Sequence, residues 1–324
     1  MILLSALKQN LRIWAKKFLP TSIIQALRRI SDRADSQARR ARVESMPEVS
    51  KETLLNDLSE AGISPGDIIM VHSSLSRIGK VSGGADAVID ALLETITDEG
   101  TLIMPCYGSA DEAFKSSKKG EPVDLRTAKS AVGKITEVFR VRKGVLRSSH
   151  PFSSSCAVGK HAEYITSGHD AGPDVCHADS PVGRLVELEG RVVGIGIPIA
   201  QGLGVAHFLE DTWDDFPFEV HSDRASITYI DADGKETTRD VSRYDPKISR
   251  TRVDYPDGQW ICKTLTEHMI RVGLMKQFKF GQADSWLMEA RALYDELKRL
   301  AQKGVTMYLT EDGLSPENRD VLNW

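Results

Sequence analysis

The sequence predicts an α/β fold: a three-layer α/β sandwich with a mixed sheet, extended at the N-terminus by a helical segment. Short apolar runs typical of buried strands alternate with segments of helical periodicity along most of the chain, which favours helices packed on a sheet. The turn Asp-Ala-Asp-Gly at 231–234 separates two strand-like runs, 227–230 and 236–241, and predicts an antiparallel hairpin. With 324 residues, of which 41% are hydrophobic, the chain is long enough to bury a sizeable core.

Residues 1–49 are predicted to form a basic amphipathic helical extension, and residues 50–324 the main domain. Over 1–19, apolar residues recur every three or four positions, lysine and arginine lie on the other helical faces, and Pro20 ends the pattern. Two interpretations stay open: a helix lying on an anionic membrane surface, or a helix packed on the main domain or on a partner subunit. Residues 31–49 are polar and rich in arginine, so we expect a solvated helix or linker there.

The elements of the main domain are predicted from periodicity and turn residues. Further strands are expected at 67–72, 101–104 and 191–197. Helices are expected at 51–61, 84–95, 131–141, 205–213, 259–273 and 284–302. Ser50 and Ser130 are the expected caps of the first and third of these helices. Residues 106–128 are expected to form a polar loop.

The charge distribution argues against a nucleic-acid-binding protein. Net charge is −4, but residues 1–50 hold ten Lys and Arg against four Asp and Glu, so the rest of the chain carries a surplus of ten acidic groups. Contacts to phosphates need clustered positive charge, whereas an acidic body suits a cationic ligand.

The four cysteines, at 106, 156, 176 and 262, are far apart and include no Cys-x-x-Cys pair. We therefore expect reduced thiols in a cytoplasmic protein, which could contact the inner membrane peripherally through residues 1–19. Cys176-His177 has no second Cys/His pair at metal spacing, so no metal site is expected. The sequence contains no run of 18 or more apolar residues, which argues against a membrane-spanning helix.

Three segments carry groups that could bind or transform a ligand. In the first, 71–92, a strand leads into turns rich in serine and glycine and then into a helix that begins at Gly83-Gly84. Free N–H groups and the helix dipole make such a helix start an anion site, and glycine lets a ligand approach the backbone. The pattern is neither G-x-G-x-x-G nor a P-loop. An ordinary strand–turn–helix unit is the alternative interpretation.

The second segment, RSSHPFSSSCAVG at 147–159, has an arginine, a histidine and many hydroxyls that could surround a polar ligand, although its composition favours a solvated loop. The third, 191–213, runs from a buried strand through a glycine-rich loop into a short helix carrying His207 and Glu210. A spacing of three places both side chains on one helical face, beyond the carboxyl end of a strand, where α/β proteins bind ligands. A carboxylate beside an imidazole is the usual arrangement of a general base.

In this order and at these separations, the segments resemble the aminoglycoside 3-N-acetyltransferase family. Four collinear phrases carry the resemblance: HSSLSRIGKVSGGADAVIDALLETITDEGTLIMP, RSSHPFSSSCAVG, SPVGRLVELEGRVVGIG with the H-x-x-E that follows it, and GQADSWLMEARAL at 281–293. Together they span about residues 50–302, so the resemblance covers a whole domain rather than a single motif.

The resemblance implies an acetyl-CoA-dependent N-acetyltransferase that needs no metal. The Ser/Gly-rich turn would lie along the coenzyme, and the histidine on the helix would lie close to the thioester. Carried over residue by residue, the coenzyme loop comprises Ser73, Ser74, Ser76, Gly79, Val81 and Gly83, and the base is His207. The sequence departs from the family at one point. Members often carry Thr or Ser shortly before the histidine, whereas this chain has Leu-Gly-Val-Ala at 203–206, so that hydroxyl contact is missing.

An amine must lose a proton as it attacks a thioester. We expect His207 to accept that proton as the general base. Glu210 is the expected carboxylate partner, with Asp223 and Asp240 as alternatives. Backbone N–H groups of the turn at 73–76 are candidates for stabilising the thioester oxygen.

The acidic run EDTWDDFPFE at 210–219 could line a pocket for a polyamine-like acceptor, with Trp213, Asp214 and Asp215 as binding residues; a solvated surface turn is the alternative. An aminoglycoside is the acceptor that the family implies. An amino sugar of a surface-polysaccharide precursor is a second interpretation, and an inactive scaffold that keeps the coenzyme fold is a third. The acetylated position and the formation of a homo-oligomer stay open.

Overall fold

The computed structural model describes residues 21–255 and 258–322, which divide into two compact units, one up to Pro47 and one from Glu48 onward. The first unit contains helix α2 (Thr21–Glu44), which is rich in arginine. The amphipathic pattern at 1–19 lies outside the described residues. In the part of the chain that the structure describes, no helix is both long and apolar enough to cross a bilayer.

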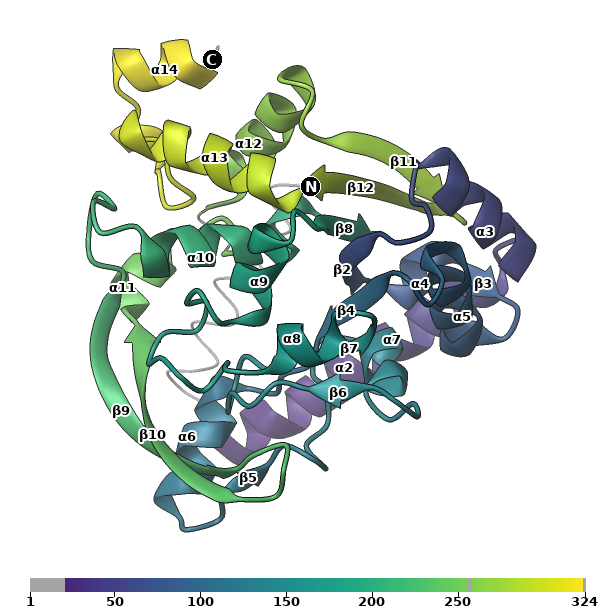
Figure 1. Cartoon of the computed structure of the whole chain (residues 1–324), viewed down its shortest axis with the longest axis horizontal. Helices are drawn as coiled ribbons and strands as arrows, with labels where there is room; N and C mark the ends of the chain where they lie inside the picture. The colour runs from purple at the N-terminus through teal and green to yellow at the C-terminus, as the bar shows by residue number, and fades with distance from the viewer. Residues whose placement is uncertain (1–20, 256–257, 323–324) are drawn as a thin grey trace. The chain divides into compact units, whose positions relative to one another are not determined.

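A seven-stranded mixed sheet forms the centre of the second unit (Figure 1). In spatial order its strands are β11 (Lys276–Phe280), β12 (Ala283–Glu289), β8 (Arg191–Ile195), β2 (Ile68–Ser73), β4 (Thr101–Pro105), β7 (Ser155–Gly159) and β6 (Leu146–Arg147). Strands β8, β2 and β4 are parallel, and the outer strands run antiparallel to their neighbours.

Helices cover both faces of this sheet. Side chains alternate along a strand, so Ile69 and Val71 of β2 pack into one core while Met70 packs into the other. The first core is closed by α3 (Lys51–Glu60), α5 (Gly84–Ile96) and α7 (Lys134–Phe139). The second is closed by α8 (Ala162–Thr166), α9 (Pro181–Glu187), α10 (Gly204–Thr212), α12 (Gln259–Arg271) and α13 (Ala290–Gln302). The prediction of a three-layer α/β sandwich with a mixed sheet is confirmed.

The predicted hairpin is also present, and it is longer than its sequence signal. Strands β9 (His221–Ile230) and β10 (Glu236–Tyr244) pair antiparallel around a turn closed by Asp231, whose Oδ1 accepts the N–H groups of Asp233 and Lys235. The short strand β5 (Val123–Asp124) extends this sheet in parallel with β9. The remaining elements include β1 (Glu48–Val49), β3 (Lys80–Val81), α4 (Leu75–Ile78), α11 (Pro246–Ser249) and α14 (Pro316–Leu322).

The prediction of a loop over 106–128 is wrong, because this stretch contains helix α6 (Ala110–Lys118) as well as β5. Ser109 caps α6, and the helix packs Ala113 and Phe114 against the hairpin. Ala110, Ala113 and Phe114 do have helical spacing, but the apolar surface on which the last two pack belongs to a distant part of the chain. Ser130 caps no helix either, since α7 begins only after Gly133.

The single helix predicted over 284–302 is in fact strand β12 followed by α13. The strand places Trp286 across the sheet from Gly194 of β8. A Cβ atom at Gly194 would lie 2.1 Å from Trp286 Cε2, so only glycine leaves room for the indole there. Trp286 Nε1 also donates to Ile197 O at 2.9 Å. Contacts far apart in sequence therefore override the helical pattern of this segment.

Candidate active site

Helix α10 holds His207 and Glu210 together. Val205 and Leu209 bury the opposite face of the helix in the core, which turns His207 toward the surface. His207 Nδ1 lies 2.8 Å from Glu210 Oε2. The Glu210 side chain is 1% exposed and the His207 side chain 23%. An ionised carboxylate accepts the Nδ1 proton, which leaves the lone pair of the neutral ring on Nε2.

The two alternative partners of His207 are engaged elsewhere. Asp223 forms an ion pair with Arg243 at 3.3 Å, and Asp240 accepts a hydrogen bond from Ser226 at 2.8 Å. The carboxylate that holds His207 is therefore Glu210.

A second carboxylate, Asp211, follows directly on α10. Its side chain is fully buried; Oδ2 accepts the N–H of Cys176 at 2.9 Å, and Oδ1 lies 3.4 Å from His221 Nε2. Burial raises the pKa of Asp211 to about 8. His221 Nδ1 in turn lies 3.3 Å from the exposed Glu219. The helix thus presents two neighbouring carboxylates, each facing an imidazole.

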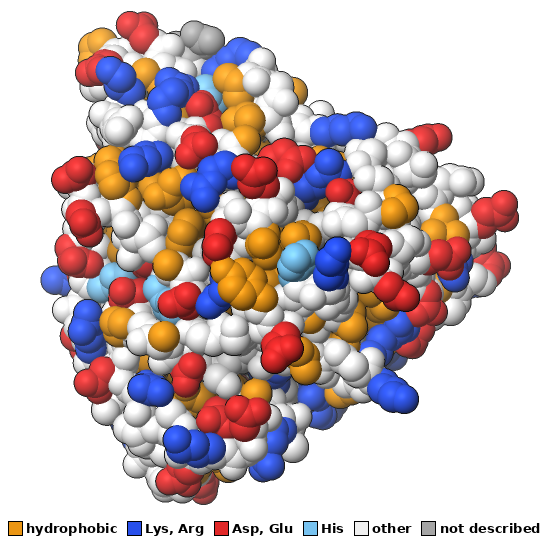
Figure 2. Space-filling model, viewed as in Figure 1, with side chains coloured by type: hydrophobic (Ala, Val, Ile, Leu, Met, Phe, Trp, Pro, Cys, Tyr) orange, Lys and Arg blue, Asp and Glu red, His pale blue; other side chains and the backbone are white. Residues whose placement is uncertain are grey.

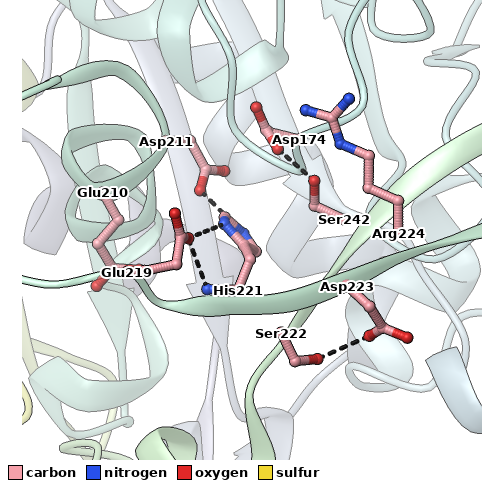
Figure 3. A pocket seen from close by; sticks show the side chains of 9 residues that line it. All are labelled: Asp174, Glu210, Asp211, Glu219, His221, Ser222, Asp223, Arg224 and Ser242. Atoms are coloured by element: carbon pink, nitrogen blue, oxygen red, sulfur yellow. Dashed lines mark hydrogen bonds and ion pairs between the residues drawn. The ribbon is translucent and has the colours of Figure 1, made fainter.

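A cavity of about 400 Å³ adjoins these groups (Figure 3). It is lined by Asp174, Glu210, Asp211, Glu219, His221, Ser222, Asp223, Arg224 and Ser242. Besides Asp211, which its raised pKa leaves mostly protonated at neutral pH, four of the nine lining side chains are carboxylates and one is an arginine, so the cavity favours a positively charged group. Glu210 both lines the cavity and holds His207.

The acidic run at 210–219 contributes to this cavity, but through members other than those predicted to bind. Glu210, Asp211 and Glu219 line it, whereas Trp213, Asp214 and Asp215 do not. Trp213 is partly buried, with Lys298 Nζ 5.3 Å from its ring centroid, and the two aspartates are exposed. On the face drawn in Figure 2, acidic and basic side chains are interspersed over the described residues.

The predicted coenzyme loop joins β2 to α5. Ser73 ends β2, Ser74 precedes α4, which contains Ser76, and Val81 lies in β3. Gly79 has φ +109°, and Gly83 has φ +82° as the residue before α5. These left-handed conformations require glycine. The N–H of Ser74 donates to Ile195 O at 2.9 Å, so this group is not available to stabilise an oxyanion.

The start of α5 fits an anionic or extended polar ligand such as coenzyme A. Gly83 offers no side chain to cap the helix, which leaves N–H groups of its first turn available. A Cβ atom built on Gly84 would meet nothing within 4 Å, so the backbone there is open to close approach.

The segment 147–155 is turned inward and binds other parts of the chain. Arg147 donates to Ser154 Oγ at 3.0 Å and to the backbone oxygens of residues 106, 125 and 128. His150 is 1% exposed, and its ring stacks on that of His169 with centroids 4.9 Å apart. Burial lowers the pKa of His150 well below its ordinary value and that of His169 to about 3. Within the described ranges, no three His, Cys, Asp or Glu side chains are grouped to hold a metal ion.

Sequence reasoning did not single out Asp211, His221 or Tyr244, although all three lie beside His207 and Glu210. The Tyr244 ring centroid is 4.9 Å from that of His207 and 4.9 Å from that of His221. The sequence contains no motif that could have indicated this cluster, because its members come from α10, β9 and β10.

Comparison with known proteins agrees with the fold. The family model for aminoglycoside 3-N-acetyltransferase matches residues 70–302. Aminoglycoside N(3)-acetyltransferase VII of Streptomyces paromomycinus is 30% identical over 76% of this chain and 89% of its own length. The corresponding values for enzyme IX of Micromonospora chalcea are 27%, 76% and 91%. Among solved structures, the binary complex of AAC-IIIb with CoASH has a TM-score of 0.66 at 25% identity, covering 77% of this chain and 94% of that one. Aminoglycoside acetyltransferase AAC(3)-Xa has a TM-score of 0.64 at 28% identity, covering 81% and 95%.

Proposed function

The chain belongs to the aminoglycoside 3-N-acetyltransferase family, and from this premise we propose that it transfers an acetyl group from acetyl-CoA to an amine of an aminoglycoside or a related amino sugar. His207 acts as the general base and Glu210 holds it in place. The observation that supports these roles is the 2.8 Å contact between a partly exposed imidazole and a fully buried carboxylate.

Acetyl-CoA supplies the acetyl group as a thioester; the solved complex of a relative with CoASH supports this coenzyme. The acceptor reacts as the neutral amine, because an ammonium nitrogen has no lone pair, and its nitrogen must lose one further proton as it bonds to the carbonyl carbon. His207 Nε2 accepts that proton, and Glu210 stabilises the imidazolium through Nδ1. The imidazolium then gives the proton to the sulfur that departs when the C–S bond breaks, which returns His207 to its neutral form.

The turn from Ser73 to Gly83 and the start of α5 are the proposed coenzyme site. The left-handed glycines at 79 and 83 shape this turn, and the uncapped N–H groups of α5 can donate to phosphate or amide oxygens. Because the N–H of Ser74 is already bonded to Ile195 O, it has no part in this proposal.

The cavity beside Glu210 is the proposed site for further ammonium groups of the acceptor. Glu219→Gln and Asp223→Asn each remove one carboxylate charge from its lining, and both side chains are at least half exposed. We expect each variant to raise KM for an acceptor with several amines about two- to fivefold, with kcat and KM for acetyl-CoA unchanged. Asp240→Asn, on the same hairpin but outside the cavity, is the matched control. An equal effect of the control would argue against an acceptor site here.

The proposed function is tested with His207→Ala, using thiol release from acetyl-CoA with a panel of aminoglycosides and polysaccharide-type amino sugars. We expect coenzyme binding to persist and turnover to fall at least about a hundredfold, because general base catalysis contributes about that much. Near-normal turnover would eliminate His207 as the base. If the unmodified chain binds the coenzyme but none of the acceptors causes thiol release, it is a scaffold. Release with the polysaccharide-type sugars alone would identify those as the acceptors.

For residues 1–19 we propose peripheral contact with an anionic membrane, supported by their basic amphipathic sequence. Co-sedimentation with phosphatidylglycerol vesicles should capture the full chain, and replacing Leu7 and Leu11 with Asp should release it. Equal partitioning of the two proteins would contradict membrane contact and favour packing of this segment on the main domain or on a partner subunit.

A further inference from the structure

We propose that Tyr244 is a positioning residue for His207: its ring, itself in contact with His221, holds the imidazole in the orientation that points Nε2 toward the substrates. This inference rests on the proposed role of His207 as the base. Tyr244 lies at the end of β10, His221 at the start of β9 and His207 on α10, so the contact joins the hairpin to the helix.

The geometry of the three rings supports the proposal. The centroids of Tyr244 and His207 are 4.9 Å apart with an angle of 47° between the ring planes, and those of Tyr244 and His221 are 4.9 Å apart with an angle of 33°. Both separations are within the range of interacting aromatic pairs. His221 is held by Glu219, which accepts its backbone N–H at 2.9 Å and lies 3.3 Å from its Nδ1. Tyr244 therefore lies between a held ring and the ring that must react.

The hairpin register shifts at this position. Arg243 lies opposite Asp223, but the next residue, Tyr244, lies opposite His221, so Ser222 has no facing residue in the ladder. A one-residue shift moves a side chain to the other face of the strand pair, and bulges of this kind redirect side chains next to active sites. Here the shift brings the ring of His221 onto the ring of Tyr244.

The contact supplies a restraint that Glu210 alone does not. The terminal torsion of a histidine has a broad energy profile, so one hydrogen bond at Nδ1 leaves the ring free to tilt. A neighbouring ring packed against the imidazole restricts that tilt. Misplacement of a catalytic group by about 1 Å lowers the rate of the chemical step without weakening substrate binding.

The restraint comes from the ring of Tyr244 rather than from its hydroxyl. The hydroxyl oxygen is buried and makes no hydrogen bond, and burial together with the charges of Asp211 and Glu210 raises the pKa of the phenol. The side chain is therefore neutral at physiological pH. Arg252, paired with Asp254, lies 5.6 Å from the ring centroid and makes a further contact to the ring. A phenylalanine would keep the ring contacts.

The test measures kcat and both KM values in the thiol-release assay for Tyr244→Leu and Tyr244→Phe. We expect Tyr244→Leu to lower kcat about tenfold with both KM values within twofold of the unmodified enzyme, and Tyr244→Phe to stay within twofold of it throughout. Phe208→Leu is the matched control, because Phe208 is next to His207 on α10 but packs its ring on Tyr294. The control should leave kcat within twofold.

An unchanged kcat in a folded Tyr244→Leu enzyme would overturn the proposal, as would a loss of activity in Tyr244→Phe equal to that in Tyr244→Leu. If Tyr244→Leu does not fold, Tyr244→Met decides: it keeps much of the side-chain volume but has no ring, and kcat should fall with both KM values unchanged. An unchanged kcat there overturns the proposal too. His207→Ala in the same assay separates a failure of the Tyr244 proposal from a failure of the proposed function. Full activity of His207→Ala would overturn the proposed function itself.

Discussion

Two parts of the molecule hold a histidine ring against another aromatic ring, and they differ in what surrounds the ring nitrogens. In the segment 147–155, His150 is buried and its ring stacks on that of His169. Neither ring nitrogen of His150 has a hydrogen-bond partner. On α10, His207 is partly exposed and its Nδ1 is bonded to Glu210. Burial without a counter-charge lowers the pKa of His150, whereas the contact of Nδ1 with Glu210 orients the ring of His207.

The comparison explains why we expect different roles for the two histidines, although both lie in segments that resemble the family. The segment 147–155 directs its polar groups inward, where they bind backbone oxygens and one another. Helix α10 buries its apolar face and leaves an imidazole next to a cavity. We therefore expect changes in the first region to affect folding stability, and changes in the second to affect turnover.

The largest effect is expected for Arg147→Met. The guanidinium donates to three backbone oxygens and to Ser154, and methionine keeps the apolar part of the side chain while removing every donor. Hydrogen bonds to a charged group contribute about 1.5–3 kcal/mol each but are not additive, so the free energy of unfolding should fall by about 3 kcal/mol. Urea denaturation measures this change. Turnover per folded molecule should stay within a few-fold; a stable Arg147→Met enzyme without turnover would place this segment in the active site.

The sequence predicts part of each region, and the difference follows from the range of the contacts involved. The pairing of His207 with Glu210 depends on helical spacing, and the hairpin on a four-residue turn, so both can be predicted locally. Strand β12 cannot, because Trp286 depends on the absence of a side chain at Gly194, 92 positions earlier in the chain. The contact of Tyr244 with His221 depends on a register shift that no local pattern indicates.

A similar limit applies to the cavity. The acidic run at 210–219 does indicate the right part of the chain, but which of its carboxylates line the cavity is decided by the end of α10 and the start of β9. The inward orientation of the serines at 147–155 is likewise decided by partners such as His169 and the oxygen of Cys106. The chemistry of a segment can thus be predicted from its residues more readily than the direction in which those residues point.

A smaller effect, and on turnover alone, is expected for Glu210→Gln. The amide keeps an oxygen that can accept the Nδ1 proton, but it removes the charge that stabilises the imidazolium. We expect kcat to fall about ten- to hundredfold, equivalent to about 1.4–2.7 kcal/mol. The free energy of unfolding should change by less than about 1 kcal/mol, as measured by urea denaturation. A large loss of stability with normal turnover per folded molecule would contradict the division between the two regions.

The smallest effect concerns the pH dependence of stability through His150. In the folded protein its pKa lies well below the ordinary value of 6.5, so below pH 6.5 the unfolded chain binds a proton that the folded chain does not. Stability from this group is therefore present above pH 6.5 and is lost as the pH falls, by about 1.4 kcal/mol per unit. Between pH 7.5 and 5.5, the unmodified protein should lose about 1.4 kcal/mol more unfolding free energy than His150→Phe, in which this group is absent. Phe152→Leu, which changes the ring packed edge-on against His150, should keep the pH dependence of the unmodified protein. Identical pH dependence in His150→Phe and the unmodified chain would mean that His150 binds a proton in the folded state as readily as in the unfolded state. The contrast between His150 and His207 would then fail.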